Sequence, residues 1–597
     1  MYVWITLGSP EKTSPGKMNG GGLMAGAIKL ELFPGALERR VDASVEAMAR
    51  EGIVERIWQK DHTVWKPEPQ EITNRLGWLH VADAMESRLP EVDSFVEEVR
   101  SDGLIQVVLL GMGGSSLAPE VLGRIFPPQP GFLRLTVLDT THPDAIARVR
   151  DGLDLKRTLF VVATKSGGTV ETISLFKYFY NLVLDVCPSH EVGGRFCAVT
   201  DPGSGLEAMA RSLAFRKIFL NDPEIGGRYS ALSYFGLVPA ALTGTDVGEI
   251  LSRGRAAAEA CRASDPAQYA GNPGLLLGAF LGTAARAGRD KMTLVVHPVF
   301  ANLADWVEQL VAESTGKEGR GILPVTGELP GPPDVYGNDR FFVFVDAGGE
   351  NRMDGLEDLR KAGFPCVRLT AADRTDVGAL FFVWEFATAV ASHLLAVNPF
   401  DQPNVESAKV QAKRMLEAYK ASGTLPRLPV AAEAQGIQVS GDVSAGTPAE
   451  ALKRFVEDLS ADGYVAVQAY VPPHEETDRA LARLQKELRD LSRRAVTVGY
   501  GPRFLHSTGQ LHKGDAGKGR FIQITDEVRN DLPIPDAPGA SASSVTFGTL
   551  IAAQAHGDRE ALLAAGRPVL RLHVTGDAAE ALGNLCDSLE AFPGVVE

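Results

Sequence analysis

Residues 159–172, with the sequence LFVVATKSGGTVET, constrain the fold of this chain more than any other stretch. Their first five residues are all apolar, which is typical of a strand buried on both faces of a parallel sheet. Hydroxyl residues, Lys165 and two glycines follow before a helical pattern begins. This arrangement favours a phosphate group, because it offers free N–H groups at a helix start, glycines that admit a close ligand, and a lysine. The alternative is an ordinary strand-to-helix turn, where the same residues act as caps.

A second apolar strand that runs into a glycine loop lies at residues 104–116. A dinucleotide-binding fingerprint is disfavoured there, because Ser115 and Ser116 replace its third glycine. Further strands are expected at 136–138 and 195–199. Repeated strand–loop–helix units predict a parallel sheet covered by helices, with ligands beyond the carboxyl ends of its strands. Both Ser-rich loops would then face one pocket.

The length and charge limit the kind of protein. A chain of 597 residues with 45% hydrophobic content predicts two or three packed domains. The formal charge of -15 argues against nucleic acid and anionic membranes as partners, because both need clustered Lys and Arg. An acidic protein that binds phosphate must concentrate positive charge in a pocket. Five scattered cysteines without a Cys-x-x-Cys pair suggest a reducing cytoplasm, with neither disulfides nor a metal site.

Two stretches invite a targeting or membrane interpretation. Residues 1–30 lack a charged and then apolar signal pattern, and we interpret them as a disordered leader, with Met18 or Met24 as other possible starts. The apolar window at 379–397 contains Glu385 and His393. It is therefore expected to be a buried core helix and not a membrane span.

Arg228 follows two glycines in the stretch DPEIGGRYS at 222–230. The glycines allow a tight turn that would aim the guanidinium at an anion or at a developing oxyanion. The alternative is a surface arginine at a helix start.

A second group of α/β units predicts a second parallel sheet, with strands at 291–297, 341–345 and 366–369. The helix between the first two, 302–313, places Gln309 and Glu313 one turn apart on the same face. A carboxylate at a helix end beside a glycine turn can act as a base, or it can simply be solvated.

Another helix opens within residues 398–409. Gln402 and Lys409 are seven residues apart, or two turns, so both side chains can face one ligand. The alternative for Lys409 is an ordinary solvated lysine.

Together, these segments resemble the glucose-6-phosphate isomerase family. GGRYS at 226–230 and FDQPNVESAK at 400–409 resemble the two family signatures, and the two Ser-rich loops and the 309–317 segment fall in the family's order. The resemblance covers roughly residues 35–420. It implies an α/β fold of two sugar-isomerase (SIS) domains, each a parallel sheet flanked by helices. The active site would lie between them, usually at the interface of a homodimer.

The resemblance also implies roles for individual residues. Glu313 matches the base that moves a proton between C2 and C1 of the open-chain sugar phosphate, Arg228 the residue that stabilises the cis-enediolate, and Lys409 a lysine that assists ring opening. Gln309 and Gln402 match substrate contacts. The phosphate-binding positions are Ser115, Thr164, Lys165, Ser166 and Thr169. Proton abstraction beside a carbonyl needs a carboxylate and a fixed cation, so no cofactor or metal is expected.

The chain departs from the family pattern at the ring-opening histidine. The corresponding segment, 376–382, has no histidine, and His393 is expected to be packed or capped. A loop at 499–514 carries His506 and His512 among glycines, and either could supply the missing group.

The predicted domains are a leader at 1–30, a first SIS domain with N-terminal helices at 31–235, a second at 236–425, a linker at 426–445 and a small α/β extension at 446–597. The last part resembles the tail of isomerase halves in transaldolase/glucose-6-phosphate isomerase fusions. The transaldolase half is absent, so we predict no transaldolase activity.

Two other functions stay open. A non-catalytic sugar-phosphate sensor built from SIS domains would keep Lys165 and Ser166 but would not need Glu313. An isomerase of a related substrate, such as mannose 6-phosphate, would use the same residues.

Overall fold

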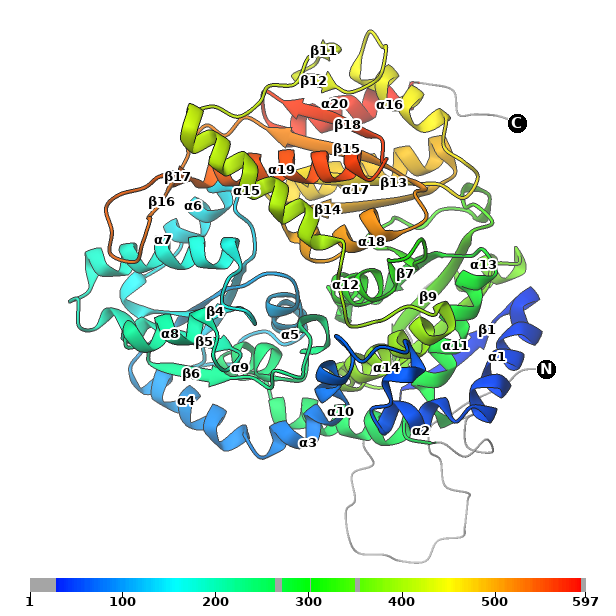
Figure 1. The fold of residues 1–597 in the computed structure, drawn as a ribbon, viewed down its shortest axis with the longest axis horizontal. Coiled ribbons are helices and arrows are strands. Elements are labelled where there is room, and N and C mark those ends of the chain that lie inside the picture. The colour runs from blue at the N-terminus through cyan, green and yellow to red at the C-terminus, as the bar shows by residue number, and fades with distance from the viewer. Residues whose placement is uncertain (1–27, 264–270, 301, 349–354, 592–597) are drawn as a thin grey trace, which may run out of the picture.

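The computed structural model describes residues 28–263, 271–300, 302–348 and 355–591. Apart from its last three residues, the predicted leader lies outside these ranges. Three larger sheets, each flanked by helices, and one two-stranded ribbon make up the described part of the molecule (Figure 1). The first sheet lies in the cyan part of the ribbon, the second in the green part except for its blue N-terminal edge strand, and the third in the yellow-to-red part.

The first sheet has the strand order β3-β2-β4-β5-β6, and all its neighbouring strands are parallel. All six residues of β4 are buried, as its apolar sequence predicted. The strands are β2 (Gln106–Leu110), β3 (Arg134–Leu138), β4 (Thr158–Ala163), β5 (Phe196–Thr200) and β6 (Lys217–Leu220). The surrounding helices are α3 (Val81–Glu86), α4 (Leu89–Ser101), α5 (Leu117–Ile125), α6 (Pro143–Asp151), α7 (Val170–Val186), α8 (Gly205–Ser212) and α9 (Tyr234–Leu242).

The second sheet has the order β1-β10-β9-β7-β8, in which only the edge strand β1 is antiparallel. Its strands are β1 (Lys29–Phe33), β7 (Lys291–Val296), β8 (Leu323–Val325), β9 (Arg340–Ala347) and β10 (Cys366–Ala371). Its helices are α1 (Glu38–Arg50), α2 (Ile53–Trp58), α10 (Val247–Ala260), α11 (Pro273–Arg286), α12 (Leu303–Thr315), α13 (Leu356–Lys361) and α14 (Val377–Leu395). The two parallel-sheet units predicted from the sequence are thus confirmed.

Helix α14 is the apolar window of the sequence. Within the described residues, Arg374–Leu395 is long and apolar enough to cross a membrane, but 89% of its most apolar window is buried inside the protein. It packs against α10 and α11. Burial raises the pKa of Glu385 well above its ordinary value, so this carboxyl is neutral inside the core. The prediction of a buried core helix is correct.

The third sheet has the order β11-β12-β18-β15-β13-β14. Its strands are β11 (Ala432–Ala434), β12 (Ile437–Ser440), β13 (Tyr464–Tyr470), β14 (Ala495–Tyr500), β15 (Gly519–Asp526) and β18 (Val569–Val574); the pair β16 (Pro533–Ile534) and β17 (Val545–Thr546) forms a separate ribbon. Its helices are α16 (Pro448–Glu457), α17 (Glu475–Ser492), α18 (Gly509–Gly514), α19 (Phe547–Ala564) and α20 (Ala578–Glu590). The segment expected to be a linker, 426–445, therefore contributes β11 and β12 to this sheet, because β12 pairs with β18 and β11 pairs with β12.

All three sheets share one topology. In each, the first four parallel strands lie in the spatial order second, first, third, fourth: β3-β2-β4-β5, β8-β7-β9-β10 and β14-β13-β15-β18. Each sheet therefore has a switch point beside its first strand, where ligands usually bind.

The C-terminal part packs tightly on both other parts. Its Tyr464 and Leu511 share an apolar cluster with Ala312 and Leu323 of the second part, and its Phe547 belongs to the core of the first. Helix α15 (Val405–Ser422) lies along α19 (Figure 1). These apolar contacts dock the third sheet firmly against the first two.

Candidate functional site

The two predicted glycine loops lie side by side. They follow strands β2 and β4, which pair directly through Leu110 and Val162. Strands β3 and β4 flank β2 on opposite edges. The strand order therefore reverses beside β2, and both loops lie at this switch point. Gly113 adopts a positive φ of 55°, which a glycine accepts without strain.

The predicted phosphate-binding residues gather in these loops. Thr164 Oγ1 and Thr169 Oγ1 are 2.9 Å apart, and Ser166 Oγ accepts a hydrogen bond from the N–H of Gly168 at 3.3 Å. Lys165 Nζ pairs with the carboxylate of Asp201 and donates to the carbonyl of Pro223 at 2.9 Å. Ser166 is exposed, whereas Ser115 is 8% exposed in the neighbouring loop.

The turn that carries Arg228 presses against the first glycine loop. A Cβ on Gly114 would lie 2.1 Å from the carbonyl oxygen of Gly227, so only glycine fits there. This close approach seats the 3-10 turn Gly227–Tyr229 next to the turn Gly113–Ser115. Behind it, the ring of Tyr229 packs on Trp78 and Phe400 at centroid distances of 5.2 and 5.3 Å.

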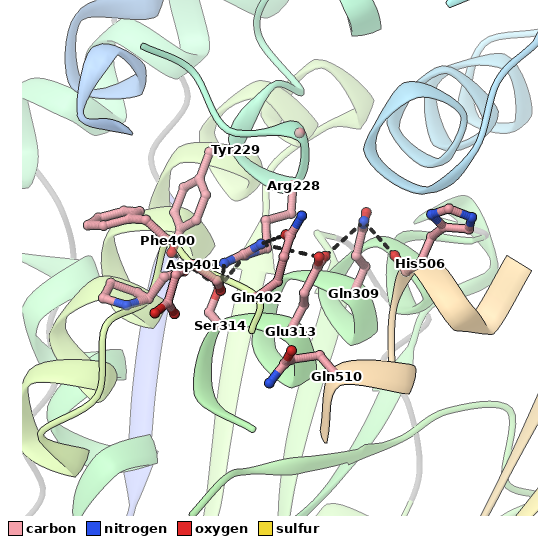
Figure 2. A network of polar contacts seen from close by, with 12 residues as sticks. Arg228, Tyr229, Gln309, Glu313, Ser314, Phe400, Asp401, Gln402, His506 and Gln510 are labelled. Atoms are coloured by element: carbon pink, nitrogen blue, oxygen red, sulfur yellow. Dashed lines mark hydrogen bonds and ion pairs between the residues drawn. The ribbon is translucent and has the colours of Figure 1, made fainter. Parts of the chain in front are cut away.

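The Arg228 guanidinium is held by several acceptors (Figure 2). Nε donates to Ser314 Oγ at 2.8 Å, and Nη1 donates to Gln402 Oε1 at 2.8 Å. Nη2 donates to the carbonyls of Pro399 and Asp401 at 2.6 and 3.0 Å. Because Arg228 is only 4% exposed, this set of bonds fixes the position of a buried positive charge.

Glu313 lies next to that charge. Its Oε1 is 3.3 Å from Arg228 Nη1, and its Oε2 accepts a hydrogen bond from Gln309 Nε2 at 3.1 Å. Gln309 also donates to the backbone carbonyl of His506 at 2.8 Å (Figure 2). Helix α12 thus points the carboxylate at the guanidinium, as the shared face of Gln309 and Glu313 suggested.

Lys317 supports this arrangement from behind. Its Nζ donates to the carbonyls of Asn398 and Asp401, each at 2.7 Å, and to Asp401 Oδ1 at 2.7 Å. Burial, together with the nearby Arg228 charge, lowers the pKa of Lys317 to about 8. The lysine fixes the backbone whose carbonyls hold Arg228. No role for Lys317 was predicted from the sequence, although it lies four residues after Glu313.

Gln402 and Lys409, the site residues predicted on α15 and in the turn before it, lie in different surroundings. Gln402 belongs to the Arg228 network. Lys409 has a side chain that is 53% exposed and lies 3.9 Å from Glu406. Its charge still acts on Glu171, a residue of α7 that the sequence analysis gave no role.

The two candidate histidines of the tail, His506 and His512, lie in different environments. His506 ends the turn Arg503–His506, and its Nε2 lies 3.1 Å from Glu171 Oε1. His512 is 2% exposed, packs among the rings of Tyr464 and Phe521, and burial lowers its pKa well below the ordinary value. His506 therefore lies beside Glu171, in the turn before α18, whereas His512 lies within α18 and packs against the rings of the third sheet.

His393 occupies a packed position, as expected. Its Nδ1 lies 2.7 Å from the carbonyl of Val64. Among the described residues, no group of three or more His, Cys, Asp or Glu side chains is arranged to hold a metal ion.

These residues combine three features: two Ser-rich glycine loops on the first sheet, a buried carboxylate, and a fixed guanidinium between the first two sheets. A carboxylate and a fixed cation within 3.3 Å can move a proton beside a carbonyl and stabilise the resulting enediolate. This fold and site define the class of aldose–ketose isomerases that act on phosphorylated sugars.

The chain is similar to known members of that class. A family model of phosphoglucose isomerase matches residues 77–322. A glucose-6-phosphate isomerase of Rubrobacter xylanophilus is 30% identical over 52% of this chain and 83% of the relative, and one of a Cyanothece species is 29% identical over 66% and 82%. The chain belongs to the glucose-6-phosphate isomerase family, whose members interconvert glucose 6-phosphate and fructose 6-phosphate.

Solved structures share the fold. A hypothetical protein from Thermus thermophilus matches with a TM-score of 0.55 and 25% identity, over 65% of this chain and 99% of that one. A glucose-6-phosphate isomerase from Chlamydia trachomatis matches with a TM-score of 0.57 and 18% identity, over 66% of this chain and 88% of that one.

Proposed function

We propose that this chain interconverts glucose 6-phosphate and fructose 6-phosphate, with Glu313 as the base that carries the proton between C2 and C1 through a cis-enediol. The contact of 3.3 Å between Glu313 Oε1 and Arg228 Nη1, in a nearly buried setting, is the observation that carries this proposal. A carboxylate so placed takes the proton from one carbon and returns it to the next.

Arg228 stabilises the negative charge that develops on the substrate oxygens. Its four hydrogen-bonded acceptors fix the guanidinium before the reaction begins, so little reorganisation is needed in the transition state. Gln309 and Gln402, bonded to the base and to the guanidinium, contact the substrate beside them.

The phosphate group binds the two glycine loops. The loops' hydroxyl side chains and glycines, with the charge of Lys165, recognise an anion in a protein that is otherwise strongly acidic. The residues we assign to this role are Ser115, Thr164, Lys165, Ser166 and Thr169.

Ring opening is assigned to His506, with assistance from Lys409. His506 Nε2 lies beside Glu171, and the backbone carbonyl of His506 accepts a hydrogen bond from Gln309, whereas the buried His512 contacts neither residue. The family resemblance further supports a homodimer in the cytoplasm.

A coupled assay tests the proposal. Fructose 6-phosphate is supplied, and glucose 6-phosphate is detected with a dehydrogenase. Glu313→Gln keeps the shape and hydrogen bonding of the side chain but removes the base, so kcat should fall by about 10² to 10⁴-fold with little change in KM. The control is Glu357→Gln, an exposed glutamate on α13 that should leave kcat unchanged.

Two results would contradict the assignment. Unchanged turnover in Glu313→Gln would remove Glu313 as the base. Purified wild-type protein that binds fructose 6-phosphate but does not convert it would favour the sugar-phosphate sensor. For the related substrate, mannose 6-phosphate is supplied together with a known glucose-6-phosphate isomerase, which converts any fructose 6-phosphate formed into the detected glucose 6-phosphate.

A further inference from the structure

The loop that carries His506 comes from the third sheet and enters between the other two. It leaves the carboxyl end of β14 and contributes His506 next to Gln309 (Figure 2). Arg503, at its start, forms ion pairs with Glu120, Asp139 and Asp305. These carboxylates come from α5, from the residue after β3 and from α12, so one arginine ties the loop to both other parts of the molecule.

The other end of the loop is fixed as firmly. Gln510 Nε2 donates to the carbonyl of Gly316 at 2.9 Å and to Asn404 Oδ1 at 2.7 Å. A Cβ on Gly316 would lie 2.4 Å from the Cβ of Leu511, so the glycine turn after Glu313 has room for the tail only because it lacks a side chain. The site of the first two sheets is thus shaped to receive this loop.

His506 is held by a network that crosses from the first sheet to the tail. Its Nε2 lies 3.1 Å from Glu171 Oε1, and the same oxygen accepts a hydrogen bond from Gln554 Nε2 of α19 at 2.7 Å. Thr141 Oγ1 donates to Gln554 Oε1 at 2.9 Å. Glu171 is 4% exposed, so its carboxylate is fixed by partners from two parts of the chain.

This network sets the orientation of the imidazole. Burial alone would raise the pKa of Glu171, but His506 and the hydrogen bonds outweigh it and hold the pKa below its ordinary value. An ionised carboxylate only accepts hydrogen bonds, so Nε2 of His506 carries a proton. No hydrogen-bond partner for Nδ1 is found among the described residues, and the side chain remains 18% exposed. The ring therefore has one nitrogen held and one free to exchange a proton with a ligand.

We propose that the C-terminal domain completes the active site within a single chain, with Glu171 and Gln554 as positioning residues for His506. His506 Nδ1 takes the proton from the O1 hydroxyl of the cyclic sugar phosphate, and the bond between C1 and O5 breaks. O5 then receives that proton from the imidazolium, which leaves an open-chain aldehyde and a hydroxyl group. This inference rests on the proposed isomerisation at Glu313. It makes a histidine from a second subunit unnecessary.

A substrate that cannot cyclise separates ring opening from isomerisation. Erythrose 4-phosphate forms no five- or six-membered ring because its O4 carries the phosphate, yet it has a C2 proton for Glu313 to remove. His506→Asn should lower turnover of glucose 6-phosphate by about 10²-fold or more. It should leave deuterium exchange at C2 of erythrose 4-phosphate unchanged, and Glu171→Gln should show the same selective loss. His190→Asn, an exposed histidine outside the tail, is the control and should change neither rate.

The results that contradict the ring-opening role differ from those that contradict the proposed isomerisation. If His506→Asn slows both reactions equally, or neither, the role in ring opening is overturned, while isomerisation at Glu313 stands. If Glu313→Gln leaves deuterium exchange in erythrose 4-phosphate intact, the proposed function itself fails.

A mixed oligomer tests whether His506 acts within its own chain. Glu313→Gln and His506→Asn chains with different tags are co-expressed and purified through both tags. If each site is complete in one chain, the mixed species gains no activity beyond the average of its two parents. If His506 serves the neighbouring chain, one site regains both residues and about half of the wild-type activity returns, which would overturn the proposal.

Discussion

Individual side chains in this protein hold charge in places where charge is costly. Arg228 and Glu313 are 4% and 6% exposed, and both are ionisable. They remain compatible with burial because each has a charged neighbour and further hydrogen bonds. Glu308, one residue before Gln309, is a different case. It accepts hydrogen bonds from Thr326 and Ser507 at 3.2 and 3.3 Å, and burial with the nearby Asp305 raises its pKa to about 8.

Glu308→Gln should make stability less dependent on pH. Because the folded pKa of Glu308 lies above its unfolded value, its contribution is fully present below about pH 4.5 and is lost as the pH rises through about 8. Each unit of pKa difference corresponds to about 1.4 kcal/mol. Thermal unfolding should therefore show a smaller decrease in Tm for Glu308→Gln than for wild type between about pH 5 and about pH 8.

The matched control is again Glu357→Gln, at an exposed position. Asp305 and Arg503 face Glu308 in both wild type and variant, so they contribute equally to the two curves. Parallel curves of Tm against pH for wild type and Glu308→Gln would show that Glu308 does not titrate in this range.

At the scale of elements, a short loop connects three sheets. The turn Arg503–His506 and helix α18 contact α5, α7 and α12 through named polar groups. Arg503 makes three of these connections. Burial alone would lower the pKa of Arg503, but the charges of Asp139, Glu120 and Asp305 outweigh burial and raise it. The pKa values of Asp139 and Asp305 are raised by burial in spite of the arginine.

Arg503→Met should destabilise the protein and slow catalysis together. Removal of the guanidinium leaves the partly buried Glu120 and Asp139, and the more exposed Asp305, without a counter-charge. The loss should stay below the about 3–5 kcal/mol that breaking a fully buried pair costs. The loss, measured by urea unfolding, should be smaller at about pH 5 than at about pH 8, because protonation relieves the carboxylates. Limited proteolysis should cut the loop at 499–514 more rapidly than in wild type.

The control for this variant is Arg479→Met. Arg479 lies on α17 in the same domain, its side chain is 68% exposed and it pairs only with the exposed Glu475. Its replacement should change stability by at most about 0.5 kcal/mol. Equal effects of the two substitutions would show that the Arg503 ion pairs do not anchor the loop.

The molecule as a whole is acidic, but it concentrates positive charge in a few places. Its formal charge is -15, yet Lys165, Arg228 and Lys317 lie around the two glycine loops and the base. Three sheets of one topology surround this region, and loops from each contribute to it. An anion that binds there is bound by several parts of the chain at once, so binding should stabilise the whole fold.

Inorganic phosphate should therefore raise the Tm of the intact protein. A ligand at about 100 times its Kd stabilises the folded state by about 2.7 kcal/mol. Lys165→Met should abolish most of this increase, because it removes the charge of the cradle. The comparison is made at matched ionic strength with sodium chloride. An equal increase in Lys165→Met would place the phosphate elsewhere.

Much of the fold was predictable because it depends on local pattern. The apolar run of β4 and the face shared by Gln309 and Glu313 are set by residues close in sequence, and the structure has both. His512 could not be separated from His506 by sequence, since both lie in one glycine-rich loop. Only the packing of α18 buries one of them and brings the other to Glu171.

The sequence by itself determined the α/β class, the two parallel sheets and the family, because hydrophobic periodicity and short motifs act over a few residues. The tertiary structure alone decided that the segment at 426–445 joins a sheet, that Lys317 supports Arg228, and that the tail reaches the site. These features depend on contacts such as the one between Gln309 and His506, which are 197 residues apart. Contacts over such separations are fixed by how whole sheets pack, and no local pattern records them.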